Sequence, residues 1–232
     1  MSARHVVIAI DGPAASGKSS TAQWVARRLG FLHVDSGSLY RAATAAQLGS
    51  GAPPEAWAEE QVMSAVARIG FRAAEGTFVP LIDGRPADDL LRGAEVTRNV
   101  SRVARMPRVR DWVNGQVRRA AESRSVVVDG RDMGTVVFPS ATLKVFLVAD
   151  PWERARRRLI QRLGRQPTDA EIAEETEQLV HRDAKDATQT VQAADAVLID
   201  TTYLTQEDQV ERIVALARAV TQRPNDTSAV DG

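Results

Sequence analysis

The chain has 232 residues, no cysteine and three histidines, and its 30 basic and 30 acidic side chains give a formal net charge of zero. Without cysteine, disulfide frameworks, thiolate zinc sites and cysteine nucleophiles are excluded, and any metal is expected to be a hard ion held by oxygen atoms. The neutral charge argues against a nucleic-acid partner, and no apolar stretch approaches the roughly 20 residues of a membrane span. We therefore expect a cytoplasmic monomer that binds neither nucleic acid nor a membrane.

Short apolar runs predict strands that are buried on both faces, at residues 5–10, 125–129, 143–149 and 196–200. Each run is followed by apolar residues at helical spacing. The first such helix is expected from Ser19 to Leu29, with Gly30 as its natural stop, and the last from Thr205 to Val220, with Thr205 and Asp208 as a capping box. Strands that alternate with helices predict an α/β fold with a mainly parallel central sheet.

Two stretches interrupt this alternation. Residues 52–93 contain a helical piece and two short runs separated by turn residues, which predicts a small insertion made of a helix and a hairpin. Residues 154–186 are dense in arginine and glutamate, with Pro167 as a break and Thr168 with Glu171 as the cap of a second helix. This second stretch is therefore expected to form a solvated helical hairpin.

Residues 12–19 read GPAASGKS and fit the phosphate-loop pattern G-x-x-x-x-G-K-[ST]. In such loops backbone N–H groups surround the β-phosphate, and the N-terminus of the following helix adds positive potential. Lys18 would reach the β- and γ-phosphates. It is one of three lysines among 30 basic residues, as expected where a compact ammonium is required. We predict an ATP site made of Gly12, Pro13, Ala14, Ala15, Ser16, Gly17, Lys18, Ser19 and Ser20.

A kinase also needs a second anion site for its acceptor, and arginines should line it. Arg131 directly follows the strand at 125–129, and ligands of parallel α/β sheets bind at the carboxyl ends of the strands. Asp129 ends that strand, and Asp35 precedes an expected turn at Ser36. With Ser19, these carboxylates are candidates for holding Mg²⁺ through water, and a helix cap is the alternative role for each aspartate.

Four motifs resemble those of the bacterial cytidylate kinases: the phosphate loop, DSGSLYR at 35–41, GRDMGTVVFP at 130–139 and RDAKD at 182–186. The similarity extends from Val6 to about Val220. The resemblance implies a three-layer P-loop kinase fold with a central parallel sheet, and an enzyme that phosphorylates CMP and dCMP with ATP and Mg²⁺. It implies one domain over residues 1–222, with its core at 1–36, 94–153 and 187–222, an enlarged NMP-binding insertion at about 37–93 and a helical lid at about 154–186. The polar composition of residues 223–232 predicts a disordered tail.

The resemblance also assigns roles to single residues. Cytosine would be read by Ser36, Ser101, Arg110 and Asp132, because its exocyclic amine needs an acceptor while the ring nitrogen and carbonyl need donors. The acceptor phosphate would be held by Arg41 and Arg131, with Arg182 and Asp186 at the ribose or the phosphate. Lys18, Arg131, Arg154 and Arg158 would act in catalysis, the last two from one face of a lid helix whose Arg156 and Arg157 are expected to be solvated.

One position departs from the family. The late motif usually continues as R-D-x-x-D-x-x-R, but here its last position is Gln189, so one contact to a phosphate is expected to be weakened. Two other interpretations remain open. One is a kinase of another small acceptor, such as UMP or AMP. The other is a phosphate-loop switch or nucleic-acid-stimulated ATPase that uses the arginines of residues 102–119, which the neutral charge and the lack of interleaved aromatic residues oppose.

Overall fold

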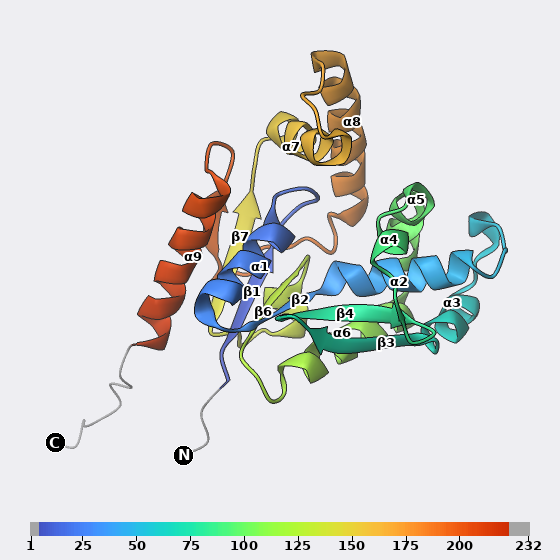
Figure 1. Cartoon of the computed structure of the whole chain (residues 1–232), viewed down its shortest axis with the longest axis horizontal. Helices are drawn as coiled ribbons and strands as arrows, with labels where there is room; N and C mark the ends of the chain where they lie inside the picture. Colours follow the sequence, from blue (N-terminus) through green and yellow to red (C-terminus); the bar gives the residue numbers. More distant parts are fainter. Residues whose placement is uncertain (1–4, 223–232) are drawn as a thin grey trace.

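The computed structural model describes residues 5–222, and a mostly parallel sheet forms its centre (Figure 1). The strands lie in the order β3-β4-β2-β6-β1-β7-β8, with β5 paired to β4. The parallel part consists of β2 (Leu32–Asp35), β6 (Val126–Gly130), β1 (Val7–Asp11), β7 (Leu143–Val148) and β8 (Val197–Asp200). The short β-branched runs form these strands because the central ones are covered on both faces, and every residue of β6 is buried.

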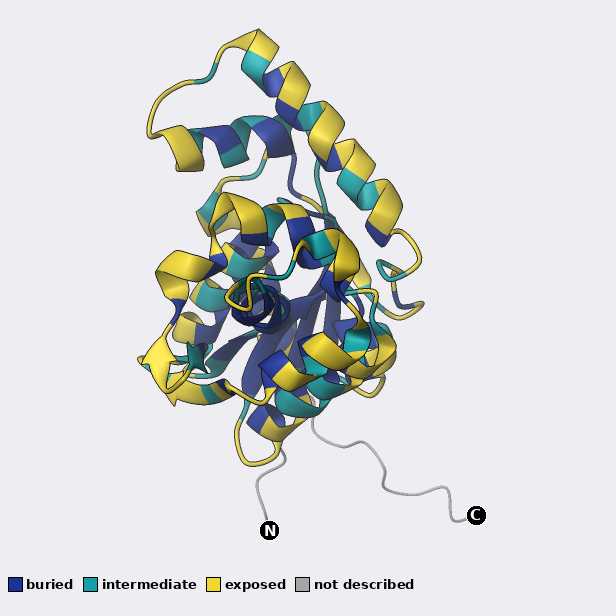
Figure 2. Cartoon of the chain, turned by 90° about the vertical axis from the view of Figure 1, so that its right-hand side faces the viewer, coloured by how far each residue is buried: buried dark blue, intermediate teal, exposed yellow. Residues whose placement is uncertain are grey.

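Alternation along the strands divides the core into two layers. Ile8 and Ile10 of β1 face the layer of α1 (Lys18–Leu29) and α9 (Gln206–Thr221). Ala9 faces the opposite layer, whose main helices are α2 (Ser36–Leu48), α3 (Glu59–Val66), α5 (Ala94–Val103) and α6 (Pro107–Ala121). The three-layer arrangement is visible in Figure 2, where the dark-blue sheet lies inside helices whose outer faces are exposed.

The register of the strands brings polar residues to one edge of the sheet. Asp11 of β1 lies opposite Gly130 of β6, and Asp35 of β2 lies opposite Asp129 of β6. All of these residues stand at the carboxyl ends of their strands, where ligands of parallel sheets bind. The fold therefore gathers the phosphate loop, Asp35 and the segment after β6 in one place.

The two additions to the core have the predicted secondary structure. The first contains a single 3-10 turn (Pro54–Ala56), α3, the antiparallel strands β3 (Ile69–Ala74), β4 (Thr77–Ile82) and β5 (Arg85–Pro86), and the short α4 (Asp88–Leu91). Its hairpin extends the central sheet, because Thr77 of β4 pairs with His33 of β2. The second consists of α7 (Pro151–Leu163) and α8 (Asp169–Asp186), capped by Thr168 and Glu171, and projects beyond the sheet (Figures 1 and 2).

The predicted strands and terminal helices are confirmed, and Gly30 and the capping box of Thr205 with Asp208 end and start their helices as expected. Two features differ. Strand β2 is not predicted by the apolar pattern of the sequence, because its four residues include a polar histidine. The turn expected at Ser36 is wrong, because Asp35 accepts a hydrogen bond from the backbone N–H of Ser38 and so starts α2. The predicted disordered tail at 223–232 lies outside the described residues.

None of the helices within residues 5–222 has the length and apolar character needed to cross a membrane.

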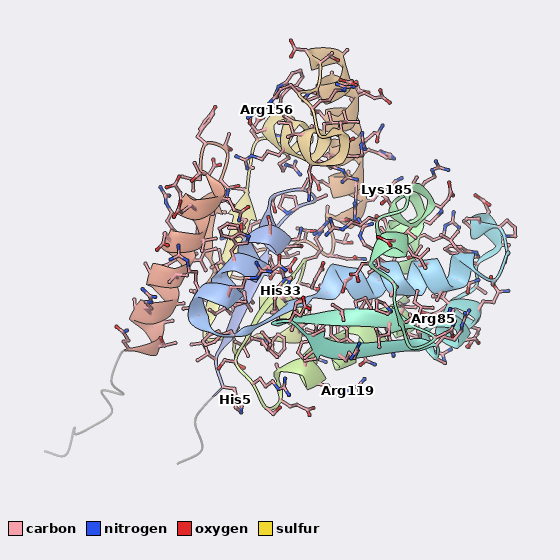
Figure 3. All side chains as sticks on the ribbon, in the orientation of Figure 1. His5, His33, Arg85, Arg119, Arg156 and Lys185 are labelled. Carbon is pink, nitrogen blue, oxygen red and sulfur yellow. The ribbon has the colours of Figure 1, made fainter. Side chains whose placement is uncertain are left out.

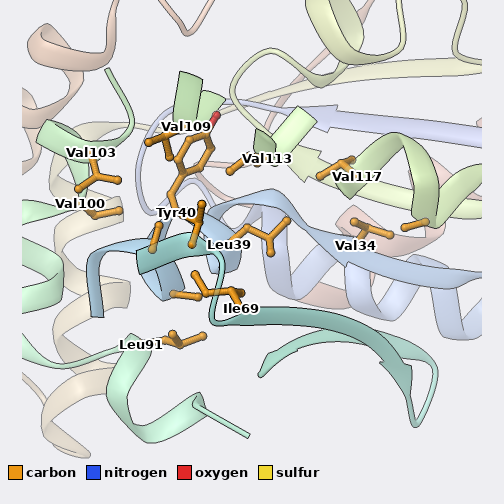
Figure 4. Close-up of a cluster of buried hydrophobic side chains, with 14 of the residues drawn as sticks. Val34, Leu39, Tyr40, Ile69, Leu91, Val100, Val103, Val109, Val113 and Val117 are labelled. Atoms are coloured by element: carbon orange, nitrogen blue, oxygen red, sulfur yellow. The ribbon is translucent and has the colours of Figure 1, made fainter. Parts of the chain in front are cut away.

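The core layer that contains α2 depends on close packing around Leu39 of that helix. Leu39 is fully buried among valines of α5 and α6 (Figure 4). We predict that Leu39→Ala lowers the free energy of unfolding by about 2–5 kcal/mol, because it removes apolar contact and leaves a cavity. The matched control is Leu90→Ala on α4, where the leucine is exposed, with an expected change within about 0.5 kcal/mol. Urea unfolding measures both, and equal losses would contradict the packing described here.

Candidate functional site

A cavity of about 1430 Å³ opens at the carboxyl edge of the sheet, between the phosphate loop, α2, α5 and the α7–α8 hairpin. Most of the predicted site residues line it together: Ala14, Ala15, Gly17, Lys18, Ser19, Ser20, Asp35, Ser36, Arg41, Ser101, Arg110, Asp129, Arg131, Asp132, Arg158, Arg182 and Asp186. Gly12, Pro13, Ser16 and Arg154 are absent from its lining. One cavity thus joins the predicted ATP and acceptor sites.

The phosphate loop has the backbone that its sequence predicts. Gly12 has a φ of 154°, and a Cβ there would lie 2.3 Å from the carbonyl oxygen of Leu147, so only glycine fits. Gly17 adopts a left-handed conformation immediately before α1, whose N-terminus faces the cavity side of the loop. Lys18 is buried and donates from Nζ to the carbonyl oxygen of Pro13 at 3.1 Å. The loop therefore presents backbone donors and a lysine to an anion.

The position of Lys18 disfavours the positive charge of its ammonium group. Burial, together with the positive charge of Arg131, lowers the pKa of Lys18 to about 7, although Asp129 and Asp35 act in the opposite direction. A phosphate bound in the loop would favour the charged ammonium.

Three oxygens beside Lys18 fit a magnesium ion held mainly by a nucleotide. Ser19 donates from its hydroxyl to Oδ2 of Asp129, and burial followed by the charge of Asp129 raises the pKa of Asp35. Mg²⁺ prefers oxygen ligands and is usually held by one or two carboxylates together with phosphates. The donor set of Ser19, Asp129 and Asp35 meets that requirement. Within residues 5–222 no group of three or more His, Cys, Asp or Glu side chains is placed to hold a metal ion by itself.

Arginines from three elements converge on the other part of the cavity. Arg131 and Arg182 each lie 3.7 Å from the same carboxylate oxygen of Asp186. Within the described part of the chain, their buried Nε atoms have no hydrogen-bond partner. Burial and the neighbouring charges of Arg131 and Arg41 lower the pKa of Arg182 to about 10. A single carboxylate does not balance these guanidinium groups, so the cluster is suited to an added anion.

Arg41 is held by α4 and α5. Its Nη1 donates to the carbonyl oxygen of Leu91 and to Oγ1 of Thr97, both at 3.0 Å. Burial lowers the pKa of Arg41, as do Arg158, Arg92 and Arg131, whereas Asp35 raises it. Contacts with α4 and α5 thus fix one cation of the predicted acceptor site.

The residues predicted to read cytosine all line this cavity, and two of them, Arg110 and Asp132, are in direct contact. Arg110 donates to Asp132 through Nη2 and to Oε1 of Gln189 through Nη1 at 2.9 Å. Burial raises the pKa of Asp132, and Arg110 opposes that increase. Ser36 donates to the backbone oxygen of Asp129 at 2.8 Å, and Ser101 lines the same cavity. Gln189, expected only as a weakened phosphate contact, here accepts a hydrogen bond that orients Arg110.

The lid arginines lie differently from the expectation. Arg158 lines the cavity and pairs with Glu175 at 3.0 Å, but Arg154 is buried and donates to the carbonyl oxygen of Ala14 and to Asp183. Arg157 was expected to be solvated. That expectation is wrong, because its Nη2 donates to the backbone oxygens of Thr201 and Thr202, each at 2.7 Å.

Arg156 is half-exposed and pairs with Glu153 one turn earlier.

The family profile described as Cytidylate kinase matches residues 8–219. The chain belongs to the cytidylate kinase family.

Members of the family with curated names cover most of the chain. A cytidylate kinase of Limosilactobacillus reuteri (strain DSM 20016) is 38% identical over 89% of this chain and 92% of the relative. One of Geobacillus kaustophilus (strain HTA426) is 40% identical over 92% of this chain and 96% of the relative. A crystal structure of an uncharacterized protein from Eubacterium ventriosum ATCC 27560 is similar in fold alone, with a TM-score of 0.52, 11% identity, and coverage of 94% of this chain and 100% of that chain.

Residues outside the family motifs, or unassigned within them, also shape the site. Asp183 lies in the RDAKD motif; it accepts from the backbone N–H of Ala14 at 3.1 Å and so ties α8 to the phosphate loop. Asp11 accepts from the backbone N–H groups of Met133 and Gly134, and burial raises its pKa to about 6. The acidic ends of apolar strands were the signal available for Asp11, but tertiary contacts alone reveal the role of Asp183.

We predict that nucleotide binding takes up protons through Lys18. Its pKa of about 7 means that much of it is neutral at pH 8, and bound phosphates raise that pKa. Because the pKa is higher in the complex, affinity for ADP is greatest below pH 7 and falls as the pH rises above 7. Calorimetry at pH 8 in two buffers of different ionisation enthalpy should show uptake of up to about one proton per ADP.

The control is Lys185→Met, which removes an exposed ammonium of α8 and should leave the uptake unchanged. The same binding heat in both buffers for the unmodified chain would show that Lys18 is already fully charged in the free enzyme.

Proposed function

We propose that this chain transfers the γ-phosphate of ATP to CMP, and also to dCMP, giving ADP and the nucleoside diphosphate. The observation that carries this proposal is the single cavity that joins the phosphate loop to the paired Arg110 and Asp132. Membership of the cytidylate kinase family supports the same reaction. A cytoplasmic location, a monomeric state and the absence of a nucleic-acid partner remain predictions from the sequence.

The acceptor needs no activated nucleophile, because a CMP phosphate oxygen is already an anion at neutral pH. The residues would align that oxygen with the γ-phosphate and stabilise the negative charge that spreads in the transition state. Arg41, Arg131 and Arg182, the last oriented by Asp186, would hold the acceptor phosphate, while Lys18 and Arg158 would face the transferred group. Mg²⁺, held by Ser19 and Asp129 with Asp35 nearby, would neutralise charge on the β- and γ-phosphates when bound.

Base selection would depend on Asp132. Its carboxylate can accept from the exocyclic amine of cytosine, whereas uracil would present an oxygen and leave two acceptors facing each other. Arg110 supplies donors to the ring, and Gln189 and Ala104 hold its guanidinium in place. Ser36 and Ser101 complete the proposed base site. A site that loses a hydrogen bond with the wrong base rejects that base more strongly than a site that discriminates by shape alone.

The α7–α8 hairpin would act as the lid and residues 37–93 as the NMP-binding insertion of a single domain. Closure would exclude water, which otherwise competes as acceptor. Arg154 is also proposed to act there, and reaching the phosphates would require it to release Ala14 and Asp183. Its present bonds make it a link between the lid and the phosphate loop.

A coupled ADP-release assay with ATP and Mg²⁺ tests the function. We expect kcat/KM for CMP and dCMP to exceed that for UMP and AMP by at least about 100-fold. If UMP or AMP is the better acceptor, the kinase class stands and the base assignment is wrong. ATP hydrolysis that RNA stimulates and CMP does not would instead favour a nucleic-acid-stimulated ATPase.

Asp132→Asn tests the base contact directly. We expect kcat/KM for CMP to fall by about 10–100-fold, because a charged acceptor is lost, and the ratio of UMP to CMP activity to rise. The matched control is Asp89→Asn, which neutralises an exposed carboxylate of α4 outside the cavity lining. Equal losses with CMP and UMP in the Asp132 variant would show that this carboxylate does not read the base.

A further inference from the structure

His33 is a buried imidazole in β2 that belongs to none of the family motifs. Only 6% of its surface is exposed, whereas His5 and His181 are exposed. Figure 3 places His33 in the body of the molecule and His5 near its lower edge. A buried histidine with no assigned role, on the strand next to that of Asp129, is a candidate for indirect action on the magnesium site.

Both ring nitrogens of His33 are engaged. Nε2 lies 2.7 Å from Oδ1 of Asp129, and Nδ1 lies 3.1 Å from Oγ1 of Thr77. Because an ionised carboxylate can only accept, Nε2 must carry the proton that joins it to Asp129. The Thr77 hydroxyl also lies 3.3 Å from the backbone oxygen of His33, so β4 holds the ring from the opposite side. The imidazole is thus fixed at both ends.

This contact determines how the Asp129 carboxylate is turned. With Oδ1 bound to His33, the other oxygen, Oδ2, accepts from the hydroxyl of Ser19. The charge of Asp129 helps to raise the pKa of Asp35, so the two carboxylates lie close together. A donor on Oδ1 therefore orients Asp129 within a buried site.

We propose that His33 is a positioning residue that holds Asp129 with Oδ2 turned toward Ser19 and the cavity, so that the oxygens for the nucleotide's magnesium are arranged before it binds. The proposal rests on the ATP and Mg²⁺ part of the proposed function and not on the identity of the acceptor. His33 borders the same cavity, and its direct contact there is with Asp129. Its influence passes through Asp129, as outer partners of metal ligands act in general.

A purely structural role for His33 would predict a different result. Removing a buried, bonded ring would then lower stability without changing how magnesium affects nucleotide affinity. The two roles are separated by His33→Leu, which removes the donor, and His33→Gln, whose amide nitrogen can occupy a place similar to Nε2. His5→Leu is the matched control, because it removes an exposed imidazole outside the site.

The experiment is a calorimetric titration of each variant with ADP, once with EDTA and once with excess Mg²⁺. For His33→Leu we expect affinity for ADP with Mg²⁺ to fall by at least about tenfold, and affinity without Mg²⁺ to stay within about twofold. His33→Gln should recover most of the loss, and His5→Leu should match the unmodified chain. The Mg²⁺ concentration for half-maximal turnover should be highest for His33→Leu, lower for His33→Gln and unchanged for His5→Leu. KM for CMP should be unchanged in all three variants.

Equal changes with and without Mg²⁺, or no change in either, would overturn the proposal. If His33→Leu does not fold, the protonation of Nε2 in the unmodified chain still decides the matter. Nitrogen NMR of the free protein should show a protonated, hydrogen-bonded Nε2 of His33, and an unprotonated Nε2 would overturn the proposal. Failure of every monophosphate as acceptor, with the magnesium effect retained, would refute the proposed function and leave the role of His33 intact.

Discussion

The mutual repulsion of cations gathered around one cavity is the constraint on which the rest of the site depends. Lys18, Arg41, Arg131 and Arg182 come from four different segments, and burial and neighbouring cations, Arg131 in each case, lower the pKa values of Lys18, Arg41 and Arg182. A chain with zero net charge thus concentrates positive charge at one place. The repulsion among these cations is unfavourable when no anion is bound. Two phosphate-bearing ligands would offset it, and this would favour the binding of two substrates.

The fold makes this arrangement possible because rigid elements hold each cation. The parallel register sets the phosphate loop beside Asp129 and Arg131, and α4 with α5 fixes Arg41. Carboxylates then divide the cavity into regions. Asp129 and Asp35 lie near Lys18, Asp186 lies between two arginines, and Asp132 is paired with Arg110. Local charge, rather than total charge, would distinguish the two proposed substrate sites.

The sequence predicted the elements whose signals are local. GPAASGKS between an apolar run and an amphipathic helix located the phosphate loop, and Thr168 with Glu171 located the start of α8. Strand β2 was missed because it is short and contains His33, which is stabilised by Thr77 and Asp129, residues 44 and 96 positions away. The contacts of Arg154, Arg157 and Gln189 likewise depend on which segments meet in space, and no spacing in the sequence encodes that.

One cavity is proposed to hold both nucleotides, with the acceptor phosphate on the arginine cluster and the acceptor base at Asp132. A crystal structure of the chain with CMP and a non-hydrolysable ATP analogue would test this arrangement. We expect the CMP phosphate within hydrogen-bonding distance of Arg41, Arg131 and Arg182, and the cytosine amine on the carboxylate of Asp132. CMP bound with its base away from Asp132, or outside this cavity, would contradict the account.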